Sequence, residues 1–304
     1  MKYIFIMNPA AGKRNGIMRY VDKVQSLCDE NELKYAIHIS ESEDDILDYV
    51  NMVCRTEEEA LRIYAVGGDG TLSHVVNACV GCENVEIGVI PMGTGNDYVR
   101  NFTNETKCFR SIEKQLLARS QKVDVIRVGE KYCINTINVG LDANVGNDMP
   151  KYKKMPLVSN KMAYNMSLFN NLCKKLGRGI EIYADGEQVY KGEVALCCVA
   201  NGTSCGGGFA LAPKAEIDDG KVEISYILVP KKIKLPKIFM QVKKRVQFEQ
   251  EPAKSYVRVV SCKSGRIVLD KESSIGIDGE IQSQQEVEFE VVEGAISFIV
   301  PSND

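Results

Sequence analysis

A glycine-rich turn, VGGDGT at residues 66–71, is the feature that most restricts how this chain can fold. It stands between residues 63–66, which read as a buried strand, and residues 72–79, which read as a helix. Successive glycines let the backbone approach a bulky anion, and the helix that follows offers unpaired N–H groups and the positive end of its dipole. An ordinary turn capped by Asp69 or Thr71 would explain the same residues. An aspartate in an anion-binding loop is useful only beside a divalent cation or as a proton acceptor.

Two further turns of similar design follow other strands. PMGTGND at residues 91–97 comes after a strand at 87–90 and places Asp97 at a helix start, where it could also serve only as a cap. NPAAGK at residues 8–13 comes after the first strand and has neither the Walker spacing nor a dinucleotide fingerprint. Ligands of open α/β sheets bind beyond the carboxyl ends of the strands, so the three turns together predict a phosphate site.

Length and periodicity predict two domains. The chain has 304 residues, and a domain takes ~100–200. Residues 1–124 alternate strand-like and helix-like segments, which is typical of an α/β domain with a mostly parallel sheet. Residues 125–293 contain short strands and turns that predict a mainly antiparallel β-sandwich, interrupted by helices at 161–176 and 234–246. The run 294–304 is expected to return to the first domain.

Composition excludes several classes of protein. A net charge of −3 argues against a general nucleic-acid binder. Eleven scattered cysteines do not form a disulfide framework, so a reducing cytoplasm is the expected location. Apolar runs stay well below the ~18 residues of a transmembrane helix, so we expect no transmembrane segment and only peripheral, transient membrane contact. The sequence leaves a homodimer open.

A basic segment stands out in this acidic chain. Residues 225–254 hold eight basic and two acidic residues, with apolar side chains interleaved. The pattern is typical of an amphipathic helix that binds anionic lipid, but a solvated helix over a core stripe would look the same.

Taken together, the motifs resemble the diacylglycerol kinase catalytic-domain superfamily, which includes bacterial soluble lipid kinases and the sphingosine and ceramide kinases. The matches follow the family's order: NPxxG at 8–12, GGDGT at 67–71, GTGND at 93–97, GGGFALAPKA at 206–215, DG at 219–220 and DGE at 278–280. GGDGT alone also occurs in NAD kinases and phosphofructokinases, so the combination carries the specificity. The resemblance implies an NAD-kinase-like N-terminal domain, a C-terminal β-sandwich and an ATP cleft between them.

The resemblance also implies which residues bind ATP and metal. The ATP-binding residues would be Asn8, Pro9, Ala10, Ala11, Gly12, Ser40, Gly67, Gly68, Asp69, Gly70, Thr71, Leu72, Ser73, Gly93, Thr94 and Asn96. A structural Mg²⁺ would be held by Glu216, Asp219 and the main-chain carbonyl of Lys221. The family commonly has aspartate where this chain has Glu216.

Phosphoryl transfer then needs a base for the acceptor hydroxyl and stabilisation of the charge on the moving phosphoryl group. We assign the base to Glu280, with Asp278 as the second choice, because an extended 278–280 segment projects both acids to one side. Asp69 and Asp97 would bind or orient the catalytic Mg²⁺ and the acceptor hydroxyl. Without the family context, Asp278-Gly279 reads as a hairpin turn.

The sequence therefore predicts an ATP-dependent kinase that phosphorylates a primary hydroxyl of a membrane lipid, diacylglycerol first, to give phosphatidic acid. Alternatives are a sphingoid-base or ceramide kinase and a kinase of a soluble metabolite such as NAD. A regulator that senses ATP without turning it over is the non-enzyme alternative, and the four acidic residues named above argue against it.

Overall fold

The computed structural model describes residues 1–304 except 12–15, 103–105, 141–147, 149–150, 152–176 and 303–304. Gly12 and the helix predicted at 161–176 lie outside the described residues. The chain divides into two compact units, Met1–Val125 with Val292–Asp304 (unit 1) and Ile126–Val291 (unit 2). Among the helices that the structure describes, none has the length and apolarity that crossing a bilayer requires.

Unit 1 contains a parallel sheet. Its strands are β1 (Lys2–Met7), β2 (Lys34–Ile39), β3 (Leu61–Gly67) and β4 (Val85–Pro91). They stand in the order β2-β1-β3-β4, and every neighbouring pair is parallel. From β1 the chain crosses to β2 on one side and then to β3 on the other, so the strand order reverses between β1 and β3. Ligands of open α/β sheets bind at such a switch point.

The last strand of the chain joins this sheet. The strand β13 (Glu280–Val300) begins in unit 2, and its residues Ser297 and Phe298 pair in parallel with β4. Phe298 is fully buried and stacks on Phe102 at a ring-centroid distance of 5.2 Å. The carboxyl end of the chain therefore supplies part of the core of unit 1.

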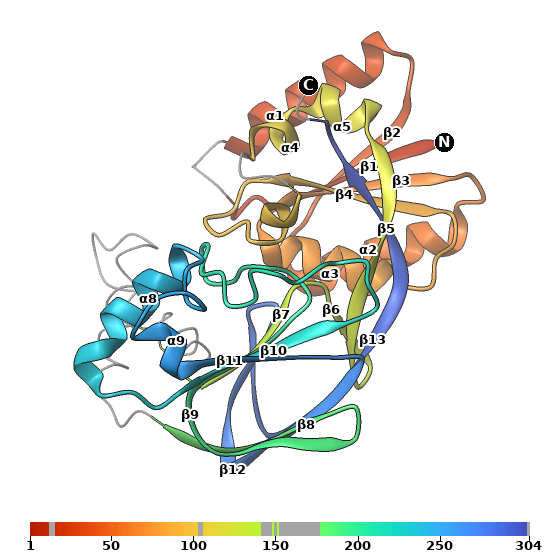
Figure 1. Ribbon diagram of the computed structural model, residues 1–304. Coiled ribbons are helices and arrows are strands. Elements are labelled where there is room, and N and C mark those ends of the chain that lie inside the picture. The colour runs from red at the N-terminus through yellow and green to blue at the C-terminus, as the bar shows by residue number, and fades with distance from the viewer. Residues whose placement is uncertain (12–15, 103–105, 141–147, 149–150, 152–176, 303–304) are drawn as a thin grey trace. The chain divides into compact units, whose positions relative to one another are not determined.

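Helices cover both faces of the sheet of unit 1. They are α1 (Gly16–Glu30), α2 (Glu43–Thr56), α3 (Asp69–Cys79), α4 (Lys107–Arg110) and α5 (Ile112–Leu117). Figure 1 shows α1, α4 and α5 on one face and α2 and α3 on the other. Buried side chains of α1 at the 3.6-residue spacing, among them Val21, Val24 and Cys28, pack on Phe5 and Val66 of the sheet. The helix expected from Asp97 is instead a single 3₁₀ turn, Tyr98–Asn101.

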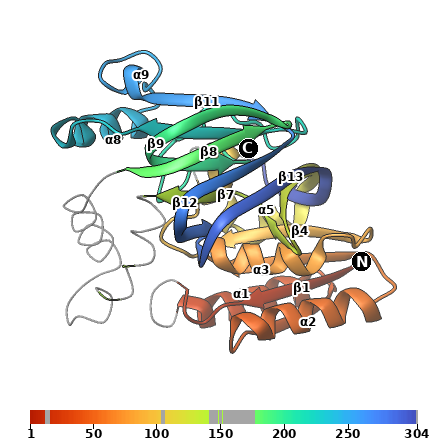
Figure 2. The same cartoon turned by 90° about the horizontal axis from the view of Figure 1, so that it is seen from below.

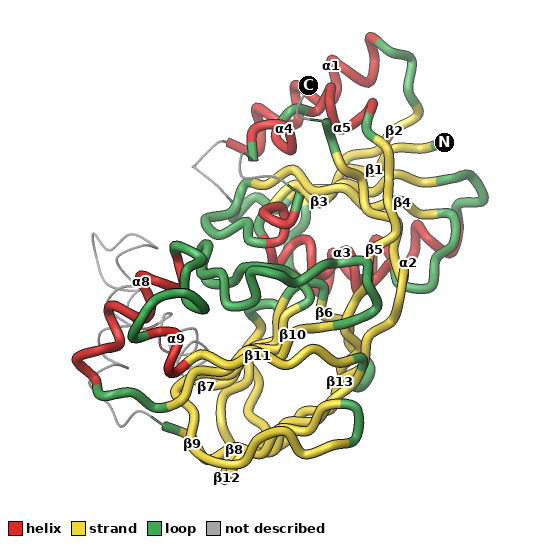
Figure 3. The backbone as a smooth tube through the Cα atoms, in the orientation of Figure 1, coloured by secondary structure: helices red, strands yellow, loops and turns green. Residues whose placement is uncertain are grey.

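Unit 2 is built mainly from strands, drawn in yellow in Figure 3, and its neighbouring strands pair antiparallel. They are β6 (Lys131–Cys133), β7 (Thr136–Gly140), β8 (Arg178–Ala184), β9 (Glu187–Ala200), β10 (Val222–Leu228), β11 (Val257–Cys262) and β12 (Ser264–Ile277), with parts of β5 (Arg119–Val128) and β13. The order runs β11-β10-β9-β7-β12-β13, and β8 pairs with both β9 and β12. Apolar side chains of these strands form one core, which confirms the predicted antiparallel β domain.

A second, smaller core of unit 2 lies under two helices. These are α8 (Leu235–Lys243), preceded by a 3₁₀ turn at Lys232–Lys234, and the short α9 (Ala253–Tyr256). Ile238 and Val242 of α8 are fully buried against Leu196 of β9 and Val257 of β11. Figure 2 shows both helices beside β11.

Candidate functional site

The turns after β1 and β3 are joined at the switch point. The backbone N–H of Asn8 donates to the carbonyl of Val66 at 3.1 Å. Its side-chain Nδ2 donates to Thr71 Oγ1 at 3.0 Å, and its Oδ1 accepts the N–H of Ala10 at 2.9 Å. One asparagine thus fixes the first turn and fastens it to the start of α3.

The turns after β3 and β4 touch through glycines. The backbone N–H groups of Met92 and Gly93 donate to the Gly67 carbonyl at 2.7 and 3.3 Å. A Cβ built on Gly93 would lie 2.6 Å from the Gly68 Cα, and one on Gly67 would lie 2.3 Å from Thr71 Oγ1. Gly67 is therefore required by its packing on Thr71 of α3, and Gly93 by the packing of its turn on Gly68.

Adding a methyl group at Gly93 is expected to destabilise the protein by ~1–3 kcal/mol, because the facing atom is backbone and cannot move aside. A Cβ on Gly70, within α3, meets nothing within 4 Å. Gly70→Ala is therefore the matched control and should stabilise the protein by up to ~1 kcal/mol through helix propensity. Urea unfolding without nucleotide measures both; equal effects of the two variants would contradict the packing argument.

Neither Asp69 nor Thr71 caps α3. The N-cap residue is Gly68, without a side-chain cap, and Thr71 instead receives the hydrogen bond from Asn8. Asp69 Oδ1 accepts the backbone N–H groups of Asp97 at 2.8 Å and Tyr98 at 3.4 Å. The ordinary-turn interpretation of VGGDGT is therefore wrong, since both polar side chains make tertiary contacts.

Two carboxylates converge here. A Cβ on Gly95 would lie 3.0 Å from Asp69 Oδ2 and 3.3 Å from Asp97 Oδ2, so both oxygens face Gly95. Asp97 is buried and forms an ion pair with Arg100 Nε at 3.3 Å. Its side chain makes no capping hydrogen bond to the 3₁₀ turn that follows it. Desolvation, together with the charge of Asp97, raises the pKa of Asp69 to about 6.

These oxygens suit a hard cation. Asp69 and Asp97 offer carboxylates, and the buried Oδ1 of Asn96 has no hydrogen-bond donor among the described residues. Mg²⁺ prefers oxygen ligands and would relieve the repulsion between the two carboxylates. The site therefore fits the metal that the sequence analysis expected beside Asp69.

Substituting Asp69 by asparagine should remove a pH dependence of stability. In the unfolded chain an aspartate titrates near ~3.9. The folded state, with a pKa of about 6 at Asp69, binds this proton more tightly, so stability falls by ~2 kcal/mol as the pH rises from about 4 to 6. Asp69→Asn, with its Oδ1 still able to accept from Asp97, should be the more stable protein at pH 7.

Urea unfolding in EDTA at pH 4 and pH 7 checks this expectation. The exposed Asp22 on α1 provides the control variant, Asp22→Asn. A pH dependence that is the same in wild type and Asp69→Asn would contradict it.

The other expected ATP-binding residues surround these turns. Ser40 is buried after β2, and its backbone N–H donates to the Met7 carbonyl at 2.9 Å. Thr94 is exposed, as are Pro9 and Ala10. Leu72 and Ser73 are buried near the start of α3, and of these two only Ser73 has a polar side chain. The exposed members are available to a ligand, whereas Leu72 supports the helix.

The sequence suggested that residues 278–280 are extended and project Asp278 and Glu280 to one side, and this prediction is wrong. Asp278 and Gly279 form the two-residue turn between β12 and β13, with φ of 46° and 95°, and Ile277 pairs with Glu280. Two successive positive φ values are the signature of a tight hairpin turn, for which Asp-Gly is favoured. The hairpin interpretation is therefore correct for Asp278-Gly279.

The Asp278 carboxylate is occupied. It accepts the backbone N–H groups of Ile134 at 2.7 Å, Asn135 at 2.9 Å and Thr136 at 3.0 Å, and the Cys133 thiol lies 3.1 Å away. Burial raises the pKa of Asp278, and these hydrogen bonds oppose the rise. Such a carboxylate holds the β6–β7 loop in place.

Glu280, by contrast, has an accessible carboxylate. Its side chain is 36% exposed, and Oε2 forms an ion pair with Lys131 Nζ at 3.0 Å. Lys131 lies on β6 and was not among the residues that the sequence indicated. Of the two acids, Glu280 is the one whose carboxylate is not held by a row of backbone N–H groups.

The residues expected to hold the second metal lie in the turn before β10. Glu216 and Asp219 are exposed, and Asp219 Oδ1 accepts the Lys221 N–H at 3.0 Å. The donor set consists of oxygens only, which fits a hard cation.

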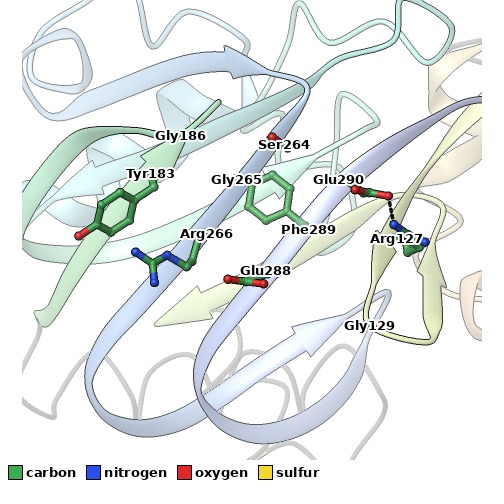
Figure 4. A pocket seen from close by; sticks show the side chains of 10 residues that line it. All are labelled: Arg127, Gly129, Tyr183, Gly186, Ser264, Gly265, Arg266, Glu288, Phe289 and Glu290. Carbon is green, nitrogen blue, oxygen red and sulfur yellow. Dashed lines mark ion pairs between the residues drawn. The ribbon is translucent and has the colours of Figure 1, made fainter.

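Unit 2 also has a hollow of about 480 Å³ on β5, β8, β12 and β13, shown in Figure 4. Arg127 is ion-paired with Glu290 there, and Arg266 lies over the Tyr183 ring at 4.5 Å. None of the residues that line it belongs to the expected sites, and its two arginines are balanced by Glu288 and Glu290. Because its charges balance, it lacks the positive excess of a phosphate site.

The buried carboxylate of Asp124 was not among the residues that the sequence indicated. Asp124 lies on β5 with 2% exposure, and its Oδ1 accepts the Gly294 N–H of β13 at 2.7 Å. The available signal was a single aspartate within the apolar run VDVI at residues 123–126. It fastens the returning strand to β5.

Comparison with known proteins gives a consistent result. A family model described as the diacylglycerol kinase catalytic domain matches residues 2–128, and one described as the YegS C-terminal NAD kinase beta sandwich-like domain matches residues 135–300. A Staphylococcus epidermidis protein named "Putative lipid kinase" is 24% identical over 288 residues, covering 94% of this chain and 91% of that protein. One of the same name from Staphylococcus carnosus is 23% identical and covers 97% and 95%.

Solved structures share the fold. A "putative diacylglycerol kinase" from Bacillus anthracis superposes with a TM-score of 0.77 at 22% identity, covering 99% of this chain and 97% of that one. An NAD kinase from Archaeoglobus fulgidus in complex with ATP gives a TM-score of 0.52 at 14% identity, covering 100% and 94%. The expected two-domain fold class is thereby confirmed.

Proposed function

Because this chain belongs to the diacylglycerol kinase family, with a YegS-type β-sandwich after the catalytic domain, we propose that it transfers the γ-phosphoryl of ATP to diacylglycerol. The product would be phosphatidic acid. The observation that carries the proposal is the convergence of three glycine-rich turns, with two carboxylates, at the switch point of the sheet. The chemistry of that convergence suits a polyphosphate with its cation.

In this proposal, the turns hold the phosphates of ATP. The start of α3 would donate N–H groups to phosphate oxygens, aided by the helix dipole. The turn at residues 8–11, whose N–H groups are already hydrogen-bonded within the fold, would line the phosphates. Thr94 would add a hydroxyl from the third turn. The close contacts between glycines keep these donors fixed before the nucleotide binds.

Bound Mg²⁺ would neutralise charge on the phosphates during transfer. Asp69, Asp97 and the Asn96 carbonyl oxygen would hold it. Asp69→Asn should therefore weaken ATP binding as well as turnover, although it stabilises the free protein. A second cation would be held by Glu216, Asp219 and the Lys221 carbonyl, where it would order the turn before β10.

Glu280 would accept the proton of the lipid hydroxyl. Its ion pair with Lys131 orients the carboxylate while leaving the side chain accessible. Asp278 would contribute by holding the β6–β7 loop, because its own oxygens are already hydrogen-bonded. The lipid belongs to a membrane, so peripheral membrane contact is part of the proposal.

Incubation of the purified protein with labelled ATP and Mg²⁺ tests the acceptor. Separate reactions contain diacylglycerol micelles, a sphingoid base, ceramide and NAD. Label in diacylglycerol alone is the expected result. Label in the sphingoid base or ceramide would identify that lipid as the substrate in place of diacylglycerol. Label only in NAD would overturn the lipid assignment.

Label in none of the acceptors would favour the non-enzyme alternative, an ATP-sensing regulator. ATP binding by calorimetry separates that outcome from a protein that does not bind nucleotide at all. The NAD alternative is included because an NAD kinase shares the fold at low identity.

A further inference from the structure

The outer face of α8 carries alternating apolar and basic side chains. Lys237 and Met240 lie on α8, Ile233 on the 3₁₀ turn before it, and Lys244 is its C-cap residue. Their spacings of four, three and four residues are those of one side of a helix. We call these four residues the outer face. All four are exposed, and Ile233 and Met240 are 87% and 49% accessible. A large apolar side chain such as Ile233 gains nothing from full exposure to water.

The opposite side of the helix fixes this orientation. Leu235, Ile238, Gln241 and Val242 are buried, and Gln241 Nε2 donates to the Glu251 carbonyl at 3.0 Å. The helix cannot roll to bury Ile233 and Met240 without exposing these residues. The outer face is therefore a permanent feature of the folded unit.

The charges of the segment that carries this face are of one sign. Residues 231–245 contain seven basic and no acidic residues, in a chain whose net charge is −3. Lys234 and Lys243 lie over the rings of Tyr256 and Phe209, at 5.2 and 5.6 Å. These contacts keep two of the cations next to the helix and its apolar side chains.

We propose that the outer face of α8 docks the protein on an anionic lipid bilayer, with Ile233 and Met240 entering the interface and the lysines pairing with lipid phosphates. This docking rests on the proposed function, which needs a lipid acceptor. The partner of the outer face is then the membrane that contains this lipid. Charge complementarity selects this occupant, because mixed basic and apolar faces are typical of interfacial helices. Each basic residue near an anionic surface strengthens binding by about fivefold.

Co-sedimentation of the full chain with vesicles tests the inference. The vesicles contain phosphatidylcholine alone or with phosphatidylglycerol. Lys237→Glu/Lys244→Glu should weaken binding to anionic vesicles at least ~25-fold. Ile233→Ser/Met240→Ser should weaken it while leaving its salt dependence in place. The control Lys107→Glu/Lys271→Glu makes the same charge change at two exposed lysines elsewhere and should bind like wild type.

Activity on a short-chain, water-soluble diacylglycerol separates this inference from the proposed function. The outer-face variants should keep wild-type turnover of that substrate and lose turnover of vesicle-embedded diacylglycerol. Outer-face variants that bind anionic vesicles as tightly as wild type would overturn the inference. A wild-type protein that does not bind anionic vesicles would overturn it as well. A wild type that binds vesicles but phosphorylates neither form of diacylglycerol would support the face and overturn the proposed function.

Discussion

Turnover of Glu280→Gln is expected to fall by ~10²–10⁴, the usual contribution of a general base, while its affinity for ATP is unchanged. Glutamine has the same size as glutamate, and its Oε1 can still accept from Lys131 Nζ, which lies 3.0 Å from the carboxylate. It cannot take up a proton, which is the role proposed for Glu280. The loss should therefore appear in kcat, with the fold and the nucleotide site intact.

Steady-state kinetics with diacylglycerol and calorimetry with ATP give the two quantities. Glu130→Gln, an exposed position in the turn between β5 and β6, is the matched control and should behave like wild type. Undiminished turnover in Glu280→Gln would show that Glu280 is not the general base. Loss of ATP binding would instead show that Glu280 helps to bind the nucleotide.

Asp278→Ala should cost ~3–9 kcal/mol of folding free energy, because it leaves three buried backbone N–H groups without an acceptor, at ~1–3 kcal/mol each. Small domains have only ~5–15 kcal/mol in total, so the variant approaches unfolding. The prediction concerns stability rather than chemistry. A catalytic role for Asp278 would instead give a stable, inactive protein.

Asp185→Ala is a close control. Asp185-Gly186 forms the same kind of turn, between β8 and β9, with φ of 49° and 85°. The Asp185 Oδ1 also accepts two backbone N–H groups, from Lys263 at 2.9 Å and Ser264 at 3.0 Å, but this residue is exposed. Water can replace its hydrogen bonds, so the loss should be ~1 kcal/mol. Equal losses in urea unfolding would show that burial does not decide the cost.

Much of the fold could be predicted from local patterns. Strand and helix periods in the first 124 residues predicted the parallel sheet with helices, and β3, α3 and β4 contain the ranges 63–66, 72–79 and 87–90 that apolar spacing predicted. The short turn after Asp97 was overestimated as a helix. Periodicity reports which face of an element is buried, and it says little about how far a polar loop continues as a helix.

Much of the site needed more than local patterns. Asp69 and Thr71 fitted helix capping equally well in sequence, and only their contacts with Asp97 and Asn8 showed otherwise. Lys131 gave no signal at all, because an ion pair between residues 149 positions apart leaves no spacing pattern. Only the structure likewise showed that the Asp278 carboxylate accepts three backbone N–H groups, whereas the Glu280 carboxylate pairs with a lysine side chain.

The sequence by itself determined the order of elements, the glycine-rich turns and the family motifs, because backbone preferences and apolar periodicity act over a few neighbouring residues. The tertiary structure alone decided which turns meet at the switch point, which carboxylates repel each other and which face of α8 stays exposed. Those properties depend on burial and on distances between segments far apart in the chain. The desolvation that raises the pKa of Asp69 to about 6 exists only after these segments have packed together.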